Sequence, residues 1–240
     1  LSNKLDRLKN VGYPLEQLML TRILETEVMD SWQEAVDYDS MDHAQVNQLF
    51  VTDLLAFVPQ LADVLDLGTG TAQIPVELCR RVPDCRVMAA DAATNMLDLA
   101  HYNVEAGGMT GRIQLCQCDA KSLPFDDGLF AAVISNSIVH HIPEPRLVLA
   151  EAVRVCAAGG VLFFRDLLRP SDEAECQTLV ATYAAECNDQ QRQMFADSLR
   201  VAVEAFARPG HERVGIVGLA LQDDSGQVVP SCARFPRAHH

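Results

Sequence analysis

Two glycines behind a carboxylate, in Asp66-Leu67-Gly68-Thr69-Gly70, are the residues of this sequence that most directly suggest chemistry. A short apolar run precedes them and a helical pattern follows, so the backbone must turn sharply or lie against a ligand, which glycine permits. The first amides of the helix lack backbone partners, and Asp66 adds a fixed negative charge. A phosphate would be repelled by Asp66, whereas a ligand with a cationic amine suits both groups. The stretch therefore predicts a nucleoside-type cofactor site.

Three more polar residues follow later apolar runs in the same way: Asp91, Asp119 and Asn136. If these runs are parallel strands, their carboxyl ends share one edge of the sheet, where open parallel sheets bind ligands. Asp91 lies about twenty residues beyond the glycine loop, where a carboxylate can accept hydrogen bonds from both ribose hydroxyls. Four consecutive strand ends therefore agree on one cofactor site.

The elements that must position these residues alternate after Pro59 between strand and helix. Such alternation predicts βαβ units and a parallel sheet covered on both faces. Strands are expected at 63–67, 86–90, 112–118, 129–135 and 161–165, and helices at 72–82, 95–106 and 144–156, with Thr94 as an N-cap. A helical region at 173–206, broken near Asn188, then precedes two strands at 213–222 and 229–235, whose short connection favours an antiparallel hairpin.

The N-terminal part is expected to be helical, with amphipathic patterns at 15–29 and 43–57. The aromatic and acidic segment 32–42 between them is expected to be a linker, either a capping loop or a lid over the cofactor site. We divide the chain into a cap or lid at 1–58 and a core at 59–240. The core includes a helical part at 171–210 and the hairpin at 211–236, and the whole is one structural unit.

The composition limits the classes of molecule that this protein is expected to bind. The 240 residues carry a formal net charge of −14, which opposes binding to nucleic acid or to an anionic membrane and favours small neutral or cationic substrates. The apolar runs are too short for a membrane span, and no secretory signal is expected. The eight cysteines show neither paired spacing nor matching histidines, so we expect reduced thiols, no metal site and a cytoplasmic protein.

At this point the sequence resembles the class I S-adenosylmethionine-dependent methyltransferases, over roughly residues 60–170. Asp91 matches the acid that binds the ribose, and Ala72 stands where many members have a third glycine. Five further segments carry the likeness: the first motif at 64–72, the start of the second helix at 95–97, the adenine segment at 118–120 with 123–125, the fourth strand at 130–136, and the lip of the active site at 140–143.

The resemblance implies an α/β, Rossmann-like doubly wound sheet of seven strands, mostly parallel with a C-terminal antiparallel hairpin, plus an N-terminal helical cap. It implies S-adenosylmethionine as the cofactor, with S-adenosylhomocysteine as the product, and places Asp66 near the methionine end and Asp119 at the adenine amino group. The cofactor-binding residues expected on this basis are Asp66, Gly68, Thr69, Gly70, Asp91, Ala92, Met96, Asp119, Ala120 and Asn136.

A sulfonium methyl is already activated, so much of the catalysis can come from in-line placement and exclusion of water, with a base only if the acceptor must lose a proton. His140 and His141, at the lip, are the candidate bases, or else they cap and pack. Asp166 either orients a base or binds a cationic substrate, or else pairs with Arg165 or Arg169. The substrate-binding candidates are Tyr13, Tyr38, Asp42 and Arg192.

The segment Ser135-Asn136-Ser137-Ile138 does not resemble the Asn/Asp-Pro-Pro-Tyr/Phe segment of amino-directed methyltransferases. Together with the acidic charge, this favours a small-molecule acceptor methylated on oxygen, sulfur or carbon, by a monomer or homodimer. One alternative is a protein of the same fold that binds the cofactor without chemistry. Another is a nicotinamide-dependent oxidoreductase, although the glycine loop lacks the full dinucleotide spacing and we find no Tyr-x-x-x-Lys pair.

Overall fold

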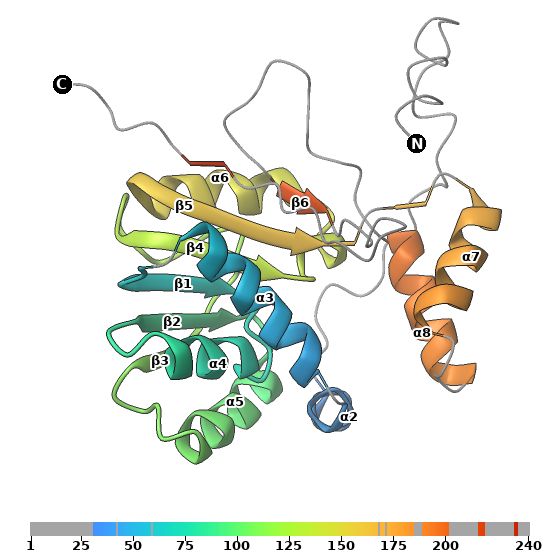
Figure 1. The fold of residues 1–240 in the computed structure, drawn as a ribbon, viewed down its shortest axis with the longest axis horizontal. Coiled ribbons are helices and arrows are strands. Elements are labelled where there is room, and N and C mark those ends of the chain that lie inside the picture. The colour runs from blue at the N-terminus through green and yellow to red at the C-terminus, as the bar shows by residue number, and fades with distance from the viewer. Residues whose placement is uncertain are drawn as a thin grey trace, which may run out of the picture.

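Five parallel strands form the centre of the molecule, in the order β3-β2-β1-β4-β5 (Figure 1). The computed structural model describes residues 31–41, 43–58, 60–167, 169–170, 172–184, 189–201, 216–218 and 233–234. The strands are β1 (Asp63–Leu67), β2 (Arg86–Asp91), β3 (Ile113–Gln117), β4 (Phe130–Asn136) and β5 (Cys156–Asp166). The chain moves outward from β1 in one direction to β3 and then returns to its other side at β4, so the strand order reverses beside β1. Open sheets bind ligands at such a point.

Helices cover both faces of this sheet, which explains why its central strands β1 and β4 are largely buried. Three of them, α3 (Ala44–Phe57), α4 (Gln73–Arg81) and α5 (Thr94–Ala106), share one core with the sheet residues that face them. On the other face, α6 (Pro145–Val155) packs on a second core. Successive residues of β1 alternate between the two cores, with Val64 in the first and Leu65 in the second.

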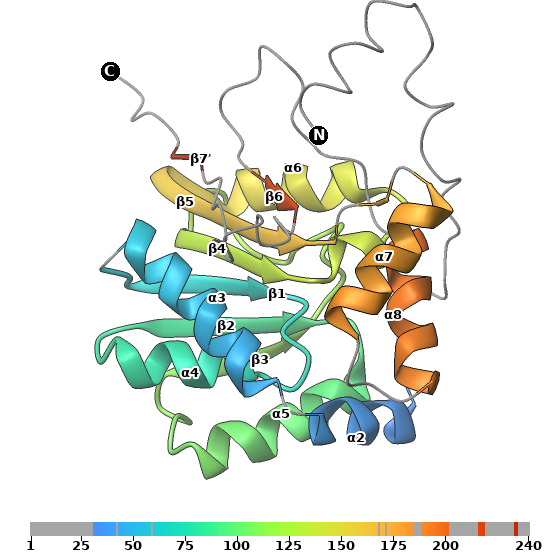
Figure 2. The same cartoon turned by 45° about the vertical axis from the view of Figure 1, so that its right-hand side comes forward.

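Three helices lie beyond the carboxyl ends of the strands (Figures 1 and 2). They are α2 (Trp32–Ser40), α7 (Glu173–Tyr183) and α8 (Asp189–Val201). The separation of α7 from α8 agrees with the break expected near Asn188, which itself lies outside the described residues, as does the helix expected at 15–29. The carboxyl ends of the strands are thus covered by α2 from the N-terminal part of the described chain and by α7 and α8 from its C-terminal part.

Two local expectations are wrong. Residues 32–40 form the helix α2 rather than a linker, because Ser31 and Glu34 make a capping box in which each side chain accepts a hydrogen bond from the other's backbone amide. Thr94 is the first residue of α5 rather than its N-cap, and its hydroxyl accepts a hydrogen bond from Gln117. The carboxylate of Asp91 instead accepts the amide of Ala93, the actual N-cap residue.

Two short strands add to the edge formed by β5. β6 (Ile216–Gly218) pairs with it in parallel and β7 (Ala233–Arg234) pairs with it antiparallel. They fall within the two ranges expected to form a hairpin, but the turn between them lies outside the described residues, and the hairpin stays a prediction. The cysteines in the described ranges are free thiols. No helix in these ranges is long and apolar enough to cross a membrane.

Candidate active site

The glycine loop after β1 is clamped between two neighbouring strands. The amides of Gly68 and Thr69 donate to the carbonyl oxygen of Ala90, at the end of β2, at 2.8 and 3.0 Å. On the other side, a Cβ on Gly68 would lie 2.0 Å from Cγ2 of Ile138, in the segment after β4. Gly68 and Gly70 have φ of +67° and +54°, so the conformation favours glycine at both positions, and close packing also requires it at Gly68.

Ala72, where the resemblance leads one to expect a third glycine, keeps the left-handed conformation that a glycine would adopt. Its φ is 59° and its ψ is 25°, and it is the N-cap residue of α4. A left-handed alanine costs about 1–2 kcal/mol relative to a right-handed one. Ala72 therefore forms the left-handed turn at a cost in backbone strain.

The carboxylate of Asp66 lies beneath this loop, with only 2% of the residue exposed. The hydroxyl of Thr69 donates to its Oδ2 at 2.7 Å. Burial raises the pKa of Asp66 to about 7, opposed by the Thr69 hydrogen bond and reinforced by the charge of Asp91. A cationic group bound here would stabilise the ionised form, so the buried carboxylate suits an ammonium or sulfonium ligand.

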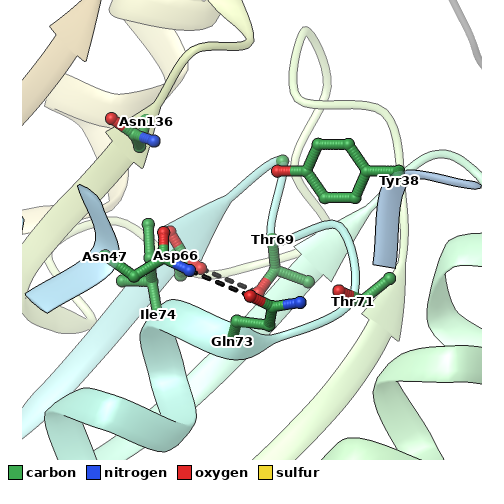
Figure 3. Close-up of a pocket in the computed structure, with 9 residues that line it drawn as sticks. Tyr38, Asn47, Asp66, Thr69, Thr71, Gln73, Ile74 and Asn136 are labelled. Carbon is green, nitrogen blue, oxygen red and sulfur yellow. Dashed lines mark hydrogen bonds between the residues drawn. The ribbon is translucent and has the colours of Figure 1, made fainter. Parts of the chain in front are cut away.

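Asp66 shares a pocket with residues from five segments of the chain (Figure 3). Its empty volume, including space open to solvent, is about 320 Å³. The lining residues are Tyr38, Asn47, Asp66, Gly68, Thr69, Thr71, Gln73, Ile74 and Asn136. The carboxyl end of β1, the carboxyl end of β4 and the two N-terminal helices α2 and α3 thus meet at one cavity, as the expectation of converging strand ends requires.

Asp91 adjoins this pocket through Gly70. Its Oδ2 accepts the amide of Gly70 at 2.7 Å and its Oδ1 accepts the amide of Ala93 at 2.9 Å. The two amides therefore fix the carboxylate in place at the end of β2.

The remaining expected cofactor residues lie outside the lining of this pocket. Asp119 follows β3, its side chain is 53% exposed, and it accepts hydrogen bonds from the backbone amide of Lys121. Met96 is buried with Ala35 beneath α2. Ala92 is exposed, and Ala120 packs against the core on the α6 face. The strand ends of β1 and β4 therefore form the enclosed part of the site, and that of β3 forms an open part.

An amide network that the sequence reasoning missed ties α2 to the loop. Asp39 Oδ1 accepts hydrogen bonds from Gln73 at 3.0 Å and from Asn103 at 2.8 Å. Asn103 also donates to the carbonyl of Thr71, and Asn47 donates to Gln73. Partial burial opposes ionisation of Asp39, but the hydrogen bonds from Gln73 and Asn103 help to outweigh it, and the pKa of that carboxyl lies below its usual value.

Tyr38, the residue before Asp39, covers the pocket. Its hydroxyl points into the cavity (Figure 3), and its Cε1 would lie 3.6 Å from a Cβ on Gly70. Burial, and then the charges of Asp66, Asp91 and Asp39, raise the pKa of Tyr38. The phenol therefore stays protonated at neutral pH and can donate a hydrogen bond to a ligand.

A buried histidine after β4 and a buried carboxylate at the end of β5 lie outside the lining of this pocket. Asp166 Oδ1 is 2.5 Å from His140 Nδ1, and the residues are 1% and 3% exposed. The amides of Val139 and Leu167 also donate to Asp166. Of the alternatives left open for Asp166, the structure places it against His140.

The other candidates are less directly placed. Arg165 pairs with Asp53 of α3 and not with Asp166. The ring of His141 lies 3.9 Å from that of His140, and burial, together with that neighbour, lowers the pKa of His141 to about 4. Arg192 is exposed on α8 and donates to the carbonyl of Ala184 at 3.1 Å. Tyr13 and Asp42 lie outside the described residues.

Comparison with known proteins shows what the central part of the chain is similar to. A family described as methyltransferase domain matches residues 65–164. A ubiquinone/menaquinone biosynthesis C-methyltransferase from Desulfotalea psychrophila is 34% identical over 113 residues, which cover 47% of this chain and 44% of that protein. A release factor glutamine methyltransferase from Chlorobaculum tepidum is 40% identical over 95 residues, which cover 38% and 32%.

A solved S-adenosylmethionine-dependent methyltransferase from Aquifex aeolicus has the same fold, with a TM-score of 0.51 and 20% identity over 60% of this chain and 76% of that one. Residues 65–164 thus match a methyltransferase domain, and a methyltransferase that uses S-adenosylmethionine as its cofactor shares the fold of this chain. The chain spans less than half the length of the two curated relatives.

The residues present fit this cofactor. Asp66 offers a buried negative charge for its cationic amino-acid end, and Asp91 offers two anchored oxygens for the ribose hydroxyls. Gly70 leaves the space of a side chain open beneath Tyr38. The amino-acid end and the ribose are thus accounted for by residues at neighbouring strand ends.

Proposed function

We propose that this protein transfers the methyl group of S-adenosylmethionine to a small-molecule acceptor with an oxygen, sulfur or carbon nucleophile. The observation that carries the proposal is the buried Asp66 carboxylate beneath the glycine loop, next to the doubly anchored Asp91. When bound, S-adenosylmethionine supplies a methyl group on a positively charged sulfur, already activated for transfer. The protein's residues have to hold it, exclude water and prepare the acceptor.

The relatives act on different acceptors, since one is named for quinone precursors and another for a glutamine of a release factor. The choice of acceptor class therefore rests on this chain's own residues. Asn136 is followed by Ser137 and Ile138 rather than by two prolines and an aromatic residue, which disfavours an amide or amine. The net charge of −14 further supports a small molecule over nucleic acid or a membrane.

Within this proposal His140 is the base that removes a proton from the acceptor. Asp166 holds the Nδ1 side of the imidazole, which makes Nε2 the nitrogen that takes the proton. The low pKa of His141 makes it the poorer base at neutral pH. Asn136 lines the pocket two residues before Ile138, so the segment from β4 to His140 leads directly from the cofactor loop to the proposed base.

Binding of S-adenosylhomocysteine and S-adenosylmethionine, measured by isothermal titration calorimetry across pH, tests the proposal. Because a bound cation favours the ionised form of Asp66, we expect affinity for S-adenosylmethionine to fall as the pH drops below about 7, by up to about tenfold per unit. Asp66→Asn should weaken binding about 10- to 100-fold at pH 7.5, since a charge-assisted hydrogen bond is lost, and should remove this pH dependence.

The same substitution should stabilise the unbound protein at high pH. Because the folded-state pKa of Asp66 is raised, its contribution to stability is present at low pH and is lost as the pH rises through about 7. Asp66→Asn is therefore expected to raise the melting temperature of the unbound protein at pH 8, and to raise it less at pH 5, because the loss begins above the unfolded pKa near 3.8. Absence of binding by the wild type to either ligand would end the proposal.

We further propose that residues 1–58 act as a cap over the site, fixed by Asp39. Asp39→Ala removes the acceptor shared by Gln73 and Asn103, and we expect about a tenfold loss of S-adenosylhomocysteine affinity and faster amide hydrogen exchange in α2. Asp37→Ala is the matched control, since Asp37 lies on the same helix and its carboxylate accepts from the exposed side chain of Gln33. Equal effects of the two substitutions would argue against a cap held by Asp39.

Two alternatives make different predictions. A protein that keeps the fold but has lost chemistry would bind the cofactor without turnover of any acceptor in a wide panel. A nicotinamide-dependent oxidoreductase would bind a dinucleotide in place of S-adenosylhomocysteine in the same titration. The buried acid beneath the glycine loop favours a cationic ligand over a pyrophosphate, and this supports the methyltransferase.

The sheet and the division of the chain into cap and core are part of the same proposal. We propose that residues 213–222 and 229–235 complete a seven-stranded sheet as an antiparallel hairpin, supported by the position of β6 and β7 within these ranges. The residues 59–240 then form the core beneath the cap. We propose a cytoplasmic monomer or homodimer.

A further inference from the structure

The connection from β3 to β4, residues 118–129, contains neither helix nor strand, yet α6 holds it at several points. Arg154 Nη2 donates to the carbonyl of Leu123 at 3.0 Å, and its Nη1 donates to that of Phe125 at 2.7 Å. The amide of Leu123 donates to Glu151 at 2.7 Å. Near the end of the loop, the amide of Gly128 donates to the carbonyl of Arg154 at 2.8 Å.

Glu151 and Arg154 themselves form a two-pronged ion pair. Arg154 Nε is 2.8 Å from Glu151 Oε1 and its Nη2 is 2.7 Å from Oε2, while Nη1 also reaches Asp127 at 2.8 Å. Hydrogen bonds from Arg154 hold the pKa of Glu151 below its usual value. Only a planar guanidinium can address a carboxylate and two carbonyls together in this way, whereas lysine offers a point charge.

The other end of this loop is the open part of the site. The amide of Cys118 donates to the carbonyl of Asp91 at 3.0 Å, which joins the end of β3 to the proposed ribose site. Asp119 then forms a turn in which its carbonyl accepts the amide of Ser122 at 2.9 Å and its Oδ1 accepts that of Lys121. The backbone of Leu123, the next residue, is hydrogen-bonded by Glu151 and Arg154 of α6.

The order of the strand ends indicates which strand contacts each part of the ligand. The buried acid of β1 suits the cationic amino-acid end, and Asp91 of β2 suits the ribose, so the base must extend toward β3 and Asp119. A carboxylate accepts hydrogen bonds but cannot donate them when ionised. It therefore favours a base with an exocyclic amine and disfavours one with a carbonyl at that position.

On the basis of the proposed function, we propose that the Glu151–Arg154 pair is a positioning device that fixes Asp119 for recognition of the adenine amino group. The pair does not reach the ligand. It holds Leu123 and Phe125, so that the turn from Asp119 to Ser122 has one conformation. Loss of the ion pair lets the turn from Asp119 to Ser122 adopt several conformations. The preference of the site for adenine over a base with a carbonyl then decreases.

Calorimetric titration with two ligands tests this inference without any acceptor. The ligands are S-adenosylhomocysteine and S-inosylhomocysteine, in which a carbonyl replaces the amino group. We expect the wild type to prefer the first by about tenfold or more, the size of one hydrogen bond to a charged group, and Arg154→Lys to reduce the preference to about threefold or less. Glu151→Gln, which keeps the shape of the side chain, is the second variant and should change the preference in the same direction.

Arg81→Lys is the matched control. Arg81 of α4 likewise pairs with a glutamate of its own helix, Glu77, and donates to the hydroxyl of Thr52. Its substitution should change neither affinity nor preference, although it replaces the guanidinium of a similar ion pair. Melting temperatures of all variants show whether each is folded.

The outcomes separate this inference from the proposed function. A reduced preference in the Arg154 or Glu151 variant, with the wild-type preference in the Arg81 variant, supports it. Equal weakening of both ligands, or an unchanged preference, overturns it and leaves only a structural role for the pair. A wild type that binds both ligands equally overturns it while the proposed function stands, and a wild type that binds neither overturns both.

Discussion

Gly68→Ala is expected to abolish measurable binding of S-adenosylhomocysteine and to destabilise the fold. The new Cβ would lie 2.0 Å from Cγ2 and 2.8 Å from Cβ of Ile138, at a φ of +67°. Left-handed backbone costs alanine about 1–2 kcal/mol, and overpacking of a core position about 1–3 kcal/mol more. We therefore expect a loss of about 2–5 kcal/mol in the free energy of unfolding, measured by urea titration, because these two costs add.

Gly108→Ala provides the matched control, since Gly108 has nearly the same φ, +68°, but a Cβ there meets nothing within 4 Å. It should cost only the backbone strain, about 1 kcal/mol, and leave the affinity for S-adenosylhomocysteine unchanged. Ile138→Ala in the Gly68→Ala background removes Cγ2 and Cδ1 but not Cβ, so partial recovery of stability is expected. Wild-type affinity in Gly68→Ala would show that the loop does not need its contact with Ile138.

His140→Asn is expected to lower methyl transfer about 10²- to 10⁴-fold, the usual contribution of a general base, while the affinity for S-adenosylhomocysteine stays within about twofold. Nδ1 of His140 lies 2.5 Å from Asp166 in a buried environment, which orients the ring and sets its tautomer. Initial rates of labelled methyl transfer, measured with an acceptor found by screening, give the effect on turnover. Calorimetry gives the affinity.

Asp166→Asn separates positioning from packing. As a positioning residue, Asp166 should affect the pH profile of turnover through the tautomer and orientation of His140, and its loss should remove a far-downfield imidazole proton from the NMR spectrum. His141→Asn is the control, with less than about a tenfold effect expected because a histidine with a pKa of about 4 is a poor base at neutral pH. A large loss in His141→Asn with normal turnover in His140→Asn would reverse the assignment.

The cofactor end of the site could be predicted because its signals are local. An apolar run, a carboxylate and glycines at φ near +60° are adjacent in the chain, and the parallel arrangement then brings Asp66, Asp91 and Asn136 to one edge. The helix α2 is also locally encoded, by the capping box of Ser31 and Glu34, although the aromatic and acidic composition of 32–42 favours a linker.

Contacts between distant side chains could not be predicted in this way. Asp39 reaches Gln73 and Asn103, which lie 34 and 64 residues away along the chain, and no periodicity relates these positions. The same holds for Arg154, whose guanidinium donates to backbone carbonyls about thirty residues earlier in the chain. This separation depends on the path of the loop and not on the period of a helix or strand. Such partners depend on the packing angles of helices and on side-chain rotamers.

The sequence by itself determined the order of strands and helices, the turn at Gly68 and Gly70, and the acids at the strand ends, because these follow from backbone conformation and the period of apolar residues. Only the tertiary structure decided that Asp166 meets His140 rather than Arg165, that Asp66 is buried enough for its pKa to reach about 7, and that Tyr38 covers the pocket. These depend on which side chains packing brings together and on how far it removes them from water, and both are properties of the assembled fold.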